Sequence, residues 1–131
     1  MKLTIETKSL PAKKNDILFS CRGKYPVKYK SQKLRDFEIE AGLQILLQKK
    51  KNKIELIDYP ITIYYKIFLN HRFNNRDVDN IVTTLSDILE ENGIIKNDAL
   101  VMKSIGEKFL INKTELEKAE IEICEYLLDK N

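Results

Sequence analysis

Apolar and polar positions alternate along the chain in two different periods, which predicts a domain that contains both strands and helices. Residues 2–8 place Leu3 and Ile5 on one side of an extended segment, and this spacing predicts a short strand. Residues 60–69 are rich in β-branched and aromatic residues and alternate more regularly, so they form the clearest predicted strand. Five apolar side chains share one face of this strand: Ile61, Ile63, Tyr65, Ile67 and Leu69.

Two other stretches have the spacing of helices that bury one side. The first follows Ser31, a residue type that can cap a helix N-terminus, and its lysine-rich end at 49–53 suits the negative pole of a helix. Its apolar positions are Leu34, Phe37, Ala41 and Ile45. The second runs from about residue 79 to 92, and Gly93 stands where a glycine commonly ends a helix. Its spacing rests on Ile81, Leu85, Ile88, Leu89 and Asn92.

The remaining segments are less regular. Residues 9–31 are predicted to form a basic loop, in which Ile17-Leu18-Phe19 could be a short strand, and residues 71–76 form a second loop. Residues 100–111 are predicted to be a strand. Residues 118–125 alternate as a strand does, but the same stretch also fits a helix. That helix would bury Leu116, Ala119, Ile123 and Leu127.

The expected fold class is α+β (mixed α/β), with one short mixed β-sheet packed with two helices in a single small domain over residues 1–131. The hydrophobic share of 43% and the charged share of 33% suit a soluble globular protein. We expect a cytoplasmic protein with no membrane contact, because no apolar run is long enough for a span and no signal peptide is visible. Cys21 and Cys124 are then expected to be free thiols.

Charge is divided unevenly along the chain. Residues 1–53 carry 14 Lys and Arg against 5 Asp and Glu, whereas residues 54–131 carry 9 against 15. A basic half fits a polyanionic partner, and an acidic half fits metal binding or solubility. A solvated charged surface explains the same distribution equally well.

The candidate chemistry is concentrated in Arg76-Asp77-Val78-Asp79-Asn80, between the clearest strand and the second helix. Two carboxylates two residues apart in an extended segment point to one side, where they would repel each other. Mg²⁺ would relieve that repulsion, because it prefers oxygen ligands. Simple capping of the helix is the alternative. Asp98, beyond the helix, is either a further ligand or a turn aspartate.

These residues together resemble the core of the RusA family of Holliday junction resolvases. The shared pattern is Arg-Asp-x-Asp-Asn, then an apolar helix that ends before a glycine, then an aspartate followed by a β-like run, and it covers about residues 59–123. It includes Asp87, in a stretch similar to the Asp-Ala-Leu of the family. The basic N-terminal loop and helix match in character and order.

The resemblance implies a homodimeric, Mg²⁺-dependent endodeoxyribonuclease, with Mn²⁺ as a potential substitute. Such enzymes, often carried by prophages, nick two strands of a four-way DNA junction symmetrically during recombination and repair. The resemblance makes Asp77, Asp79 and Asp98 the catalytic and metal-binding acids. It makes Asn80 the residue that orients them, and it places Asn97 where the family usually has a further acid. No glycine-rich phosphate loop is present, so no nucleotide cofactor is expected.

One position departs from the family. Thr83 stands one helical turn after the acidic motif, where the family usually has a lysine that would steady a phosphate or a developing charge. Lys96, Lys103 or Lys108 could replace it. Without such a replacement the chain would be a non-catalytic or weakly catalytic protein that binds branched DNA. A nuclease for flaps or forks is a further alternative.

Six basic residues are the expected DNA contacts: Arg72 and Arg76 beside the acids, and Arg22, Lys24, Lys28 and Lys30 in the basic loop. Solvated surface is the alternative for the loop. Tyr25 and Tyr29 could stack on an unpaired base. A two-fold dimer would suit a junction that presents two equivalent strands.

Overall fold

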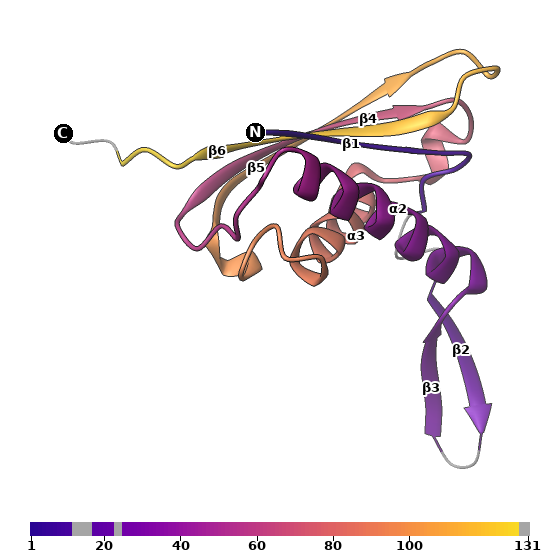
Figure 1. Ribbon diagram of the computed structural model, residues 1–131. Helices are drawn as coiled ribbons and strands as arrows, with labels where there is room; N and C mark the ends of the chain where they lie inside the picture. Colours follow the sequence, from indigo (N-terminus) through magenta and orange to yellow (C-terminus); the bar gives the residue numbers. More distant parts are fainter. Residues whose placement is uncertain (12–16, 23–24, 129–131) are drawn as a thin grey trace.

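A four-stranded sheet with two helices on one of its faces forms the body of the molecule (Figure 1). The structure is a computed structural model that describes residues 1–11, 17–22 and 25–128. The sheet contains β1 (Lys2–Thr7), β4 (Ile61–Leu69), β5 (Val101–Leu110) and β6 (Glu117–Glu125), and the helices are α2 (Gln32–Lys51) and α3 (Val78–Glu91). The order is β1-β6-β4-β5, with β4 and β5 parallel and the other neighbours antiparallel, so the predicted mixed sheet is confirmed.

The core lies between the sheet and the two helices, as the periodicity predicts. Every second residue of β4 from Ile61 to Leu69 is at most 1% exposed. The helices add the apolar positions that define their predicted inner sides: Leu34, Phe37, Ala41 and Ile45 from α2, and Ile81, Leu85, Ile88 and Leu89 from α3. No helix among the described residues is both long and apolar enough to span a membrane.

The predicted helix ends are confirmed by backbone geometry. The Ser31 hydroxyl accepts a hydrogen bond from the backbone N–H of Leu34 at 3.1 Å, which satisfies a donor in the first turn of α2. Gly93 follows α3 with φ of +73°, a conformation that favours glycine. In the last turn of α2 three lysines lie at its negative pole: Lys49, Lys50 and Lys51.

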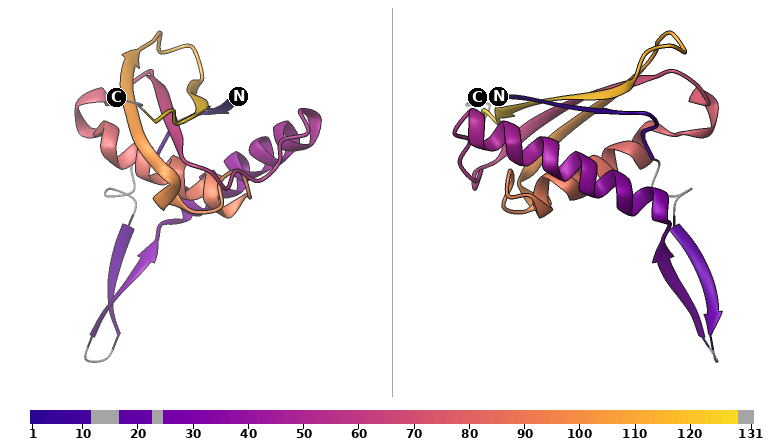
Figure 2. Two further views of the ribbon diagram at one scale, coloured as in Figure 1. Left: turned by 90° about the vertical axis from the view of Figure 1, so that its left-hand side faces the viewer. Right: turned by 45° about the vertical axis from the view of Figure 1, so that its right-hand side comes forward.

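Two predictions about the strands need correction. The short strand predicted at Ile17-Leu18-Phe19 is part of β2 (Ile17–Arg22). The prediction of a loop is wrong over residues 20–22 and 25–30, because β2 and β3 (Tyr25–Lys30) form an antiparallel hairpin that projects from the body (Figures 1 and 2). The hairpin is a two-stranded sheet that does not pair with the four-stranded sheet of the body. The helical alternative for residues 118–125 is also wrong, because β6 pairs with both β1 and β4 there.

Two glutamines of α2 cover the outer edge of β1. The side-chain amide of Gln48 accepts from the Thr4 N–H at 2.8 Å and donates to the Thr4 carbonyl at 2.7 Å. Gln44 makes the same pair of bonds with the backbone of Glu6, both at 2.8 Å. The amides therefore occupy backbone groups that a further strand would need, which closes this edge of the sheet to pairing.

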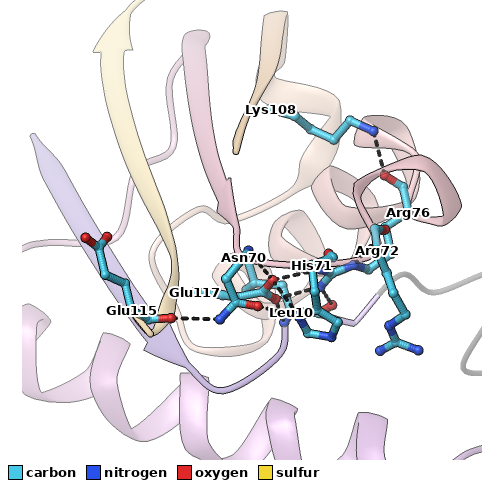
Figure 3. Close-up of polar contacts among 8 residues, drawn as sticks. All are labelled: Leu10, Asn70, His71, Arg72, Arg76, Lys108, Glu115 and Glu117. Atoms are coloured by element: carbon cyan, nitrogen blue, oxygen red, sulfur yellow. Dashed lines mark hydrogen bonds and ion pairs between the residues drawn. The ribbon is translucent and has the colours of Figure 1, made fainter. Parts of the chain in front are cut away.

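A buried ion pair joins Arg76, in the loop before α3, to Glu117, at the start of β6 (Figure 3). Arg76 is 3% exposed and Glu117 is fully buried, and the guanidinium donates to both carboxylate oxygens at 2.6 and 2.7 Å. The same guanidinium donates to the carbonyls of Leu10 and His71. The prediction that Arg76 clamps a DNA phosphate is wrong, because its donors are buried and already occupied.

The carboxylate of Glu117 has further partners. It accepts from the backbone N–H groups of Leu10 and Asn70, both at 2.8 Å. The ion pair thus connects the segment after β1, the end of β4, the loop before α3 and the start of β6. Burial alone would raise the pKa of Glu117, but Arg76 and the two backbone donors outweigh burial and lower this pKa.

We expect Glu117→Gln to lower the free energy of unfolding at pH 7 by about 3 kcal/mol, because it leaves the buried Arg76 charge unpaired. The wild-type pair contributes stability above the unfolded-state pKa, about 4.3, and loses it as pH falls through the lowered folded-state pKa. Urea unfolding between pH 2 and pH 7 should therefore show a weaker acid dependence for Glu117→Gln. Glu115→Gln, at an exposed position, is the control, and parallel curves for Glu117→Gln and the wild type would contradict this account.

Candidate functional site

The acidic motif lies at the junction between the loop after β4 and helix α3. A short 3-10 helix, η1 (Phe73–Asn75), leads into this junction. Asp77 occupies the N-cap position, but among the described residues its side chain makes no capping hydrogen bond. Its backbone carbonyl accepts from the N–H groups of Asn80 and Ile81. Capping therefore does not occupy the Asp77 carboxylate. Asp79 is in the first helical turn, where a negative charge is favoured by the helix dipole.

An open hollow, here called the Asp77–Asp79 hollow, brings these carboxylates together with a lysine. It is lined by Asp77, Val78, Asp79, Asn80 and Lys108. The Lys108 ammonium reaches from β5 and donates to the carbonyl of Phe73 at 2.7 Å. It also donates to the carbonyl of Arg76 at 3.0 Å (Figure 3). Lys108 therefore fastens the loop that carries the acids to the sheet, and it also brings a positive charge to the hollow.

Asp98 lines a second hollow, here called the Asp98 hollow. It begins the 3-10 helix η2 (Asp98–Leu100), whose N-cap is Asn97, with its side-chain oxygen accepting from the Ala99 N–H at 2.8 Å. The lining residues are Tyr65, Val82, Thr83, Ser86, Asp87, Asp98, Val101 and Ser104. Asp98 is therefore accompanied by a second acid, Asp87, rather than by the acids of the motif.

The buried phenol of Tyr65 borders the Asp98 hollow from the sheet. Burial raises the pKa of Tyr65 to about 12, a hydrogen bond with Ser86 opposes this rise, and the charge of Asp87 adds to it. Tyr65 therefore stays protonated at neutral pH and serves as a hydrogen-bonding group.

The two hollows adjoin along one side of α3. Asp79, Thr83 and Asp87 are four residues apart, so they lie on one side of the helix with about 6 Å between steps. Asp98 is thus not on the opposite side of the molecule from the motif. Among the described residues, however, no three Asp, Glu, His or Cys side chains are close enough to hold one metal ion. The gathering of all three predicted acids around a shared ion stays a prediction.

The candidates for the lysine missing at position 83 differ in placement. The Thr83 hydroxyl donates to the Asp79 carbonyl at 2.8 Å, so it serves the helix. Lys103 is paired with Thr62 and adjoins Ser104, which lines the Asp98 hollow, so Lys103 faces the other side of the sheet. Of the candidates Lys96, Lys103 and Lys108, only Lys108 lines the Asp77–Asp79 hollow.

The other predicted DNA contacts lie at two places. Arg72 is exposed beside η1, and its guanidinium points away from the Glu117 carboxylate (Figure 3). Lys28 and Lys30 are on β3, where Lys30 forms an ion pair with Glu38 at 3.0 Å that raises the pKa of Lys30. The side chains of Arg22 and Lys24 lie outside the described part of the chain.

Gly106 allows α3 to pack closely on β5 at the site, and sequence reasoning missed it. A Cβ at this position would overlap the Val78 side chain and would lie 3.1 Å from a methyl of Val82. Val78 stands between the two acids of the motif, so this contact sets how near they lie to the sheet. An isolated glycine within a strand is the signal that could have indicated such an approach.

These features are typical of a metal-dependent nuclease. Two carboxylates lie at a helix start beside a lysine, and the projecting hairpin carries further lysines. The family model for endodeoxyribonuclease RusA matches residues 11–124. The crossover junction endodeoxyribonuclease RusA of Aquifex aeolicus (strain VF5) is 31% identical over 75 residues. This match covers 57% of the chain and 56% of the relative, so it spans a little over half the length of that protein.

The chain belongs to the RusA endodeoxyribonuclease family. Nucleases of this family depend on a metal ion. Cys124, outside the site, is a free and exposed thiol, as predicted.

We expect Gly106→Ala to lower the free energy of unfolding by about 1–3 kcal/mol, because the added methyl overlaps Val78. Nuclease activity should fall even where the variant is fully folded, because a displaced Val78 would also displace its chain neighbours Asp77 and Asp79. The double variant Gly106→Ala/Val78→Ala removes the overlap and should recover part of both losses. Thermal unfolding and a nicking assay measure the two quantities, and a Gly106→Ala variant with wild-type activity would contradict this role.

Proposed function

We propose that this protein is a metal-dependent endodeoxyribonuclease that resolves four-way DNA junctions by paired nicks, in DNA recombination and repair. The observation that carries the proposal is the Asp77–Asp79 hollow with Lys108 at its border, in a chain that belongs to the RusA family. The printed name of the Aquifex relative describes a crossover junction endodeoxyribonuclease, which is the same class of activity. The cytoplasm remains the predicted location.

The donor set of the hollow fits a hard divalent cation. Asp77 and Asp79 offer carboxylate oxygens, and Asn80 offers an amide oxygen. Mg²⁺ is commonly held by one or two carboxylates together with water and substrate phosphate, and Mn²⁺ accepts the same ligands. A bound metal would activate a water molecule and neutralise charge on the phosphate. Asp98 is proposed as a further acid from the adjoining hollow.

The protein groups around the hollow would hold the DNA strand. Lys108 is proposed to stabilise the negative charge that develops at the phosphate, in place of the family's lysine, since it lines the same hollow as Asp77 and Asp79. Two of its three donors already hold the carbonyls of Phe73 and Arg76, which fixes its position. Arg72 is proposed to bind a neighbouring phosphate, because it is exposed on the same loop.

The projecting hairpin is proposed as an arm that contacts a DNA branch. Lys28 and Lys30 are two residues apart on β3, so they lie on one face of the hairpin, where phosphates would pair with them. Arg22 and Lys24 are proposed to extend this contact. Tyr29 points to the other face, is 41% exposed and is available to stack on an unpaired base. A homodimer is proposed because a four-way junction presents two equivalent strands.

A second candidate function is the binding of branched DNA with little or no cleavage. The observation that favours it is Thr83, whose hydroxyl is engaged with the helix backbone and which carries no charge. The two functions predict the same DNA affinity, and metal-dependent nicking separates them.

We expect Asp79→Asn to abolish metal-dependent nicking of a synthetic four-way junction while binding persists, because the substitution removes a metal ligand without adding bulk. The assay compares junction, flap and duplex substrates with Mg²⁺, Mn²⁺ or chelator, and a gel-shift measures binding. Asp58→Asn, at an exposed position outside both hollows, is the matched control. Tight junction binding by the wild type without nicking in either metal would support the non-catalytic alternative, and equal nicking of all substrates would remove the junction preference.

We expect Lys108→Ala to slow junction nicking by about a hundredfold, because it removes the positive charge beside the acids. Lys103→Ala removes the same side chain on the other face of β5 and should leave the rate nearly unchanged. Single-turnover rates measure both effects. Because Lys108 also fastens the loop, thermal unfolding is measured in parallel, and an unchanged rate in a folded Lys108→Ala variant would exclude the proposed role.

A further inference from the structure

The outward side of α2 carries a row of large aliphatic side chains. Ile39, Leu43, Leu46 and Leu47 are 64, 58, 46 and 69% exposed. Helical geometry advances about 100° per residue, which places Leu43 nearly opposite the core-facing Leu34 and Ala41. We call these four residues the α2 stripe. Contiguous apolar surface of this kind is typical of a protein–protein contact, because burying it in a partner removes it from water.

The outer face of the sheet differs, because its aromatic and charged residues pair with one another. The rings of Phe68 and Phe109 stack at 5.0 Å, and the Lys118 ammonium lies 4.9 Å from the Phe68 ring. Tyr64 donates to Glu107. These contacts are typical of a face adapted to solvent, whereas the α2 stripe consists of aliphatic groups alone. The stripe is therefore the better candidate for an interface.

The charges that flank the stripe identify what covers it. Asp36 lies in line with the stripe near the start of α2, and Lys50 lies in line with it near the end. In an antiparallel pair of α2 helices centred on Leu43, Asp36 faces Lys50 of the second copy, and Ile39 faces Leu47. A parallel pair would instead place like charges opposite each other. The stripe is thus complementary to itself in the antiparallel direction, as a two-fold interface requires.

We propose that a second copy of this chain docks on the α2 stripe, with the two α2 helices antiparallel. This inference names the surface through which the proposed resolvase would form a dimer. It rests on the proposed function in one respect, since cutting two strands of a junction requires two active sites. Each hairpin adjoins the start of its α2 helix (Figure 2). Because a helix of 20 residues is about 30 Å long, the antiparallel pair would place the two hairpins at opposite ends of the interface.

The first test measures self-association by analytical ultracentrifugation across a range of concentrations, without DNA or metal. We expect the wild type to be a dimer and Leu43→Glu to be a monomer, with at least a hundredfold weaker association. Leu116→Glu introduces the same charge at another exposed leucine, 54% exposed in the turn before β6, and should remain a dimer. Circular dichroism checks that the helices persist. A monomeric wild type, or a Leu43→Glu variant that dimerises as the wild type does, would overturn the proposal.

The second test determines whether the two α2 helices are antiparallel by exchanging the charges of Asp36 and Lys50. Asp36→Lys and Lys50→Asp should each weaken association about tenfold, because each places like charges opposite one another, and the double variant should restore it. Restoration would be absent in a parallel pair or in a dimer formed through the β5 edge, so its failure refutes the antiparallel arrangement.

The junction assay is run separately on the same proteins. A wild type that dimerises through the stripe but does not nick contradicts only the proposed function. A wild type that nicks as a monomer contradicts the proposed interface and the proposed homodimer, but not the proposed nuclease activity.

Discussion

The ion pair between Arg76 and Glu117 is the interaction on which the rest of the structure depends. A buried pair stabilises a fold only when its geometry is good and its remaining polar groups are satisfied, because both charges lose their hydration. Here the guanidinium and the carboxylate bond to each other twice and to the backbone on both sides. Asp77 follows Arg76 directly, so the contact that closes the fold also fixes where the acidic motif begins.

The packing of α3 on β5 then fixes how the acids face the substrate side. Gly106 lets Val78 and Val82 approach the strand, and two residues further along the strand Lys108 holds the loop before the helix. One strand therefore sets both the distance and the orientation of the first turn of α3. Carboxylates positioned by a sheet and a helix start are held more rigidly than carboxylates on a free loop. This suits a reaction whose catalytic groups must be preorganised before the DNA binds.

Sequence periodicity predicted the elements that have one buried side, since burial imposes the pattern that makes them visible. This is why β4, α2 and α3 were predicted correctly, whereas most of the hairpin, which pairs only within its own two-stranded sheet, was predicted as a loop. The role of Arg76 could not be predicted, because Glu117 is 41 residues away and nothing local indicates the pairing. Asp98 shows the same limit, since its neighbour in space is Asp87 rather than the motif.

The two helices differ in where their large apolar side chains lie, and this difference distinguishes residues needed for folding from residues available for assembly. On α3 the large apolar side chains all face the core, whereas α2 supplies apolar groups to the core on one side and exposes four more on the other. Packing within one chain explains the first set only. The hollows lie against α3 and β5, and the stripe lies on α2, so a change in assembly can leave the acids in place. In a dimer built this way, the interface determines the relative position of two active sites on one DNA junction. Each active site takes its carboxylates from its own chain.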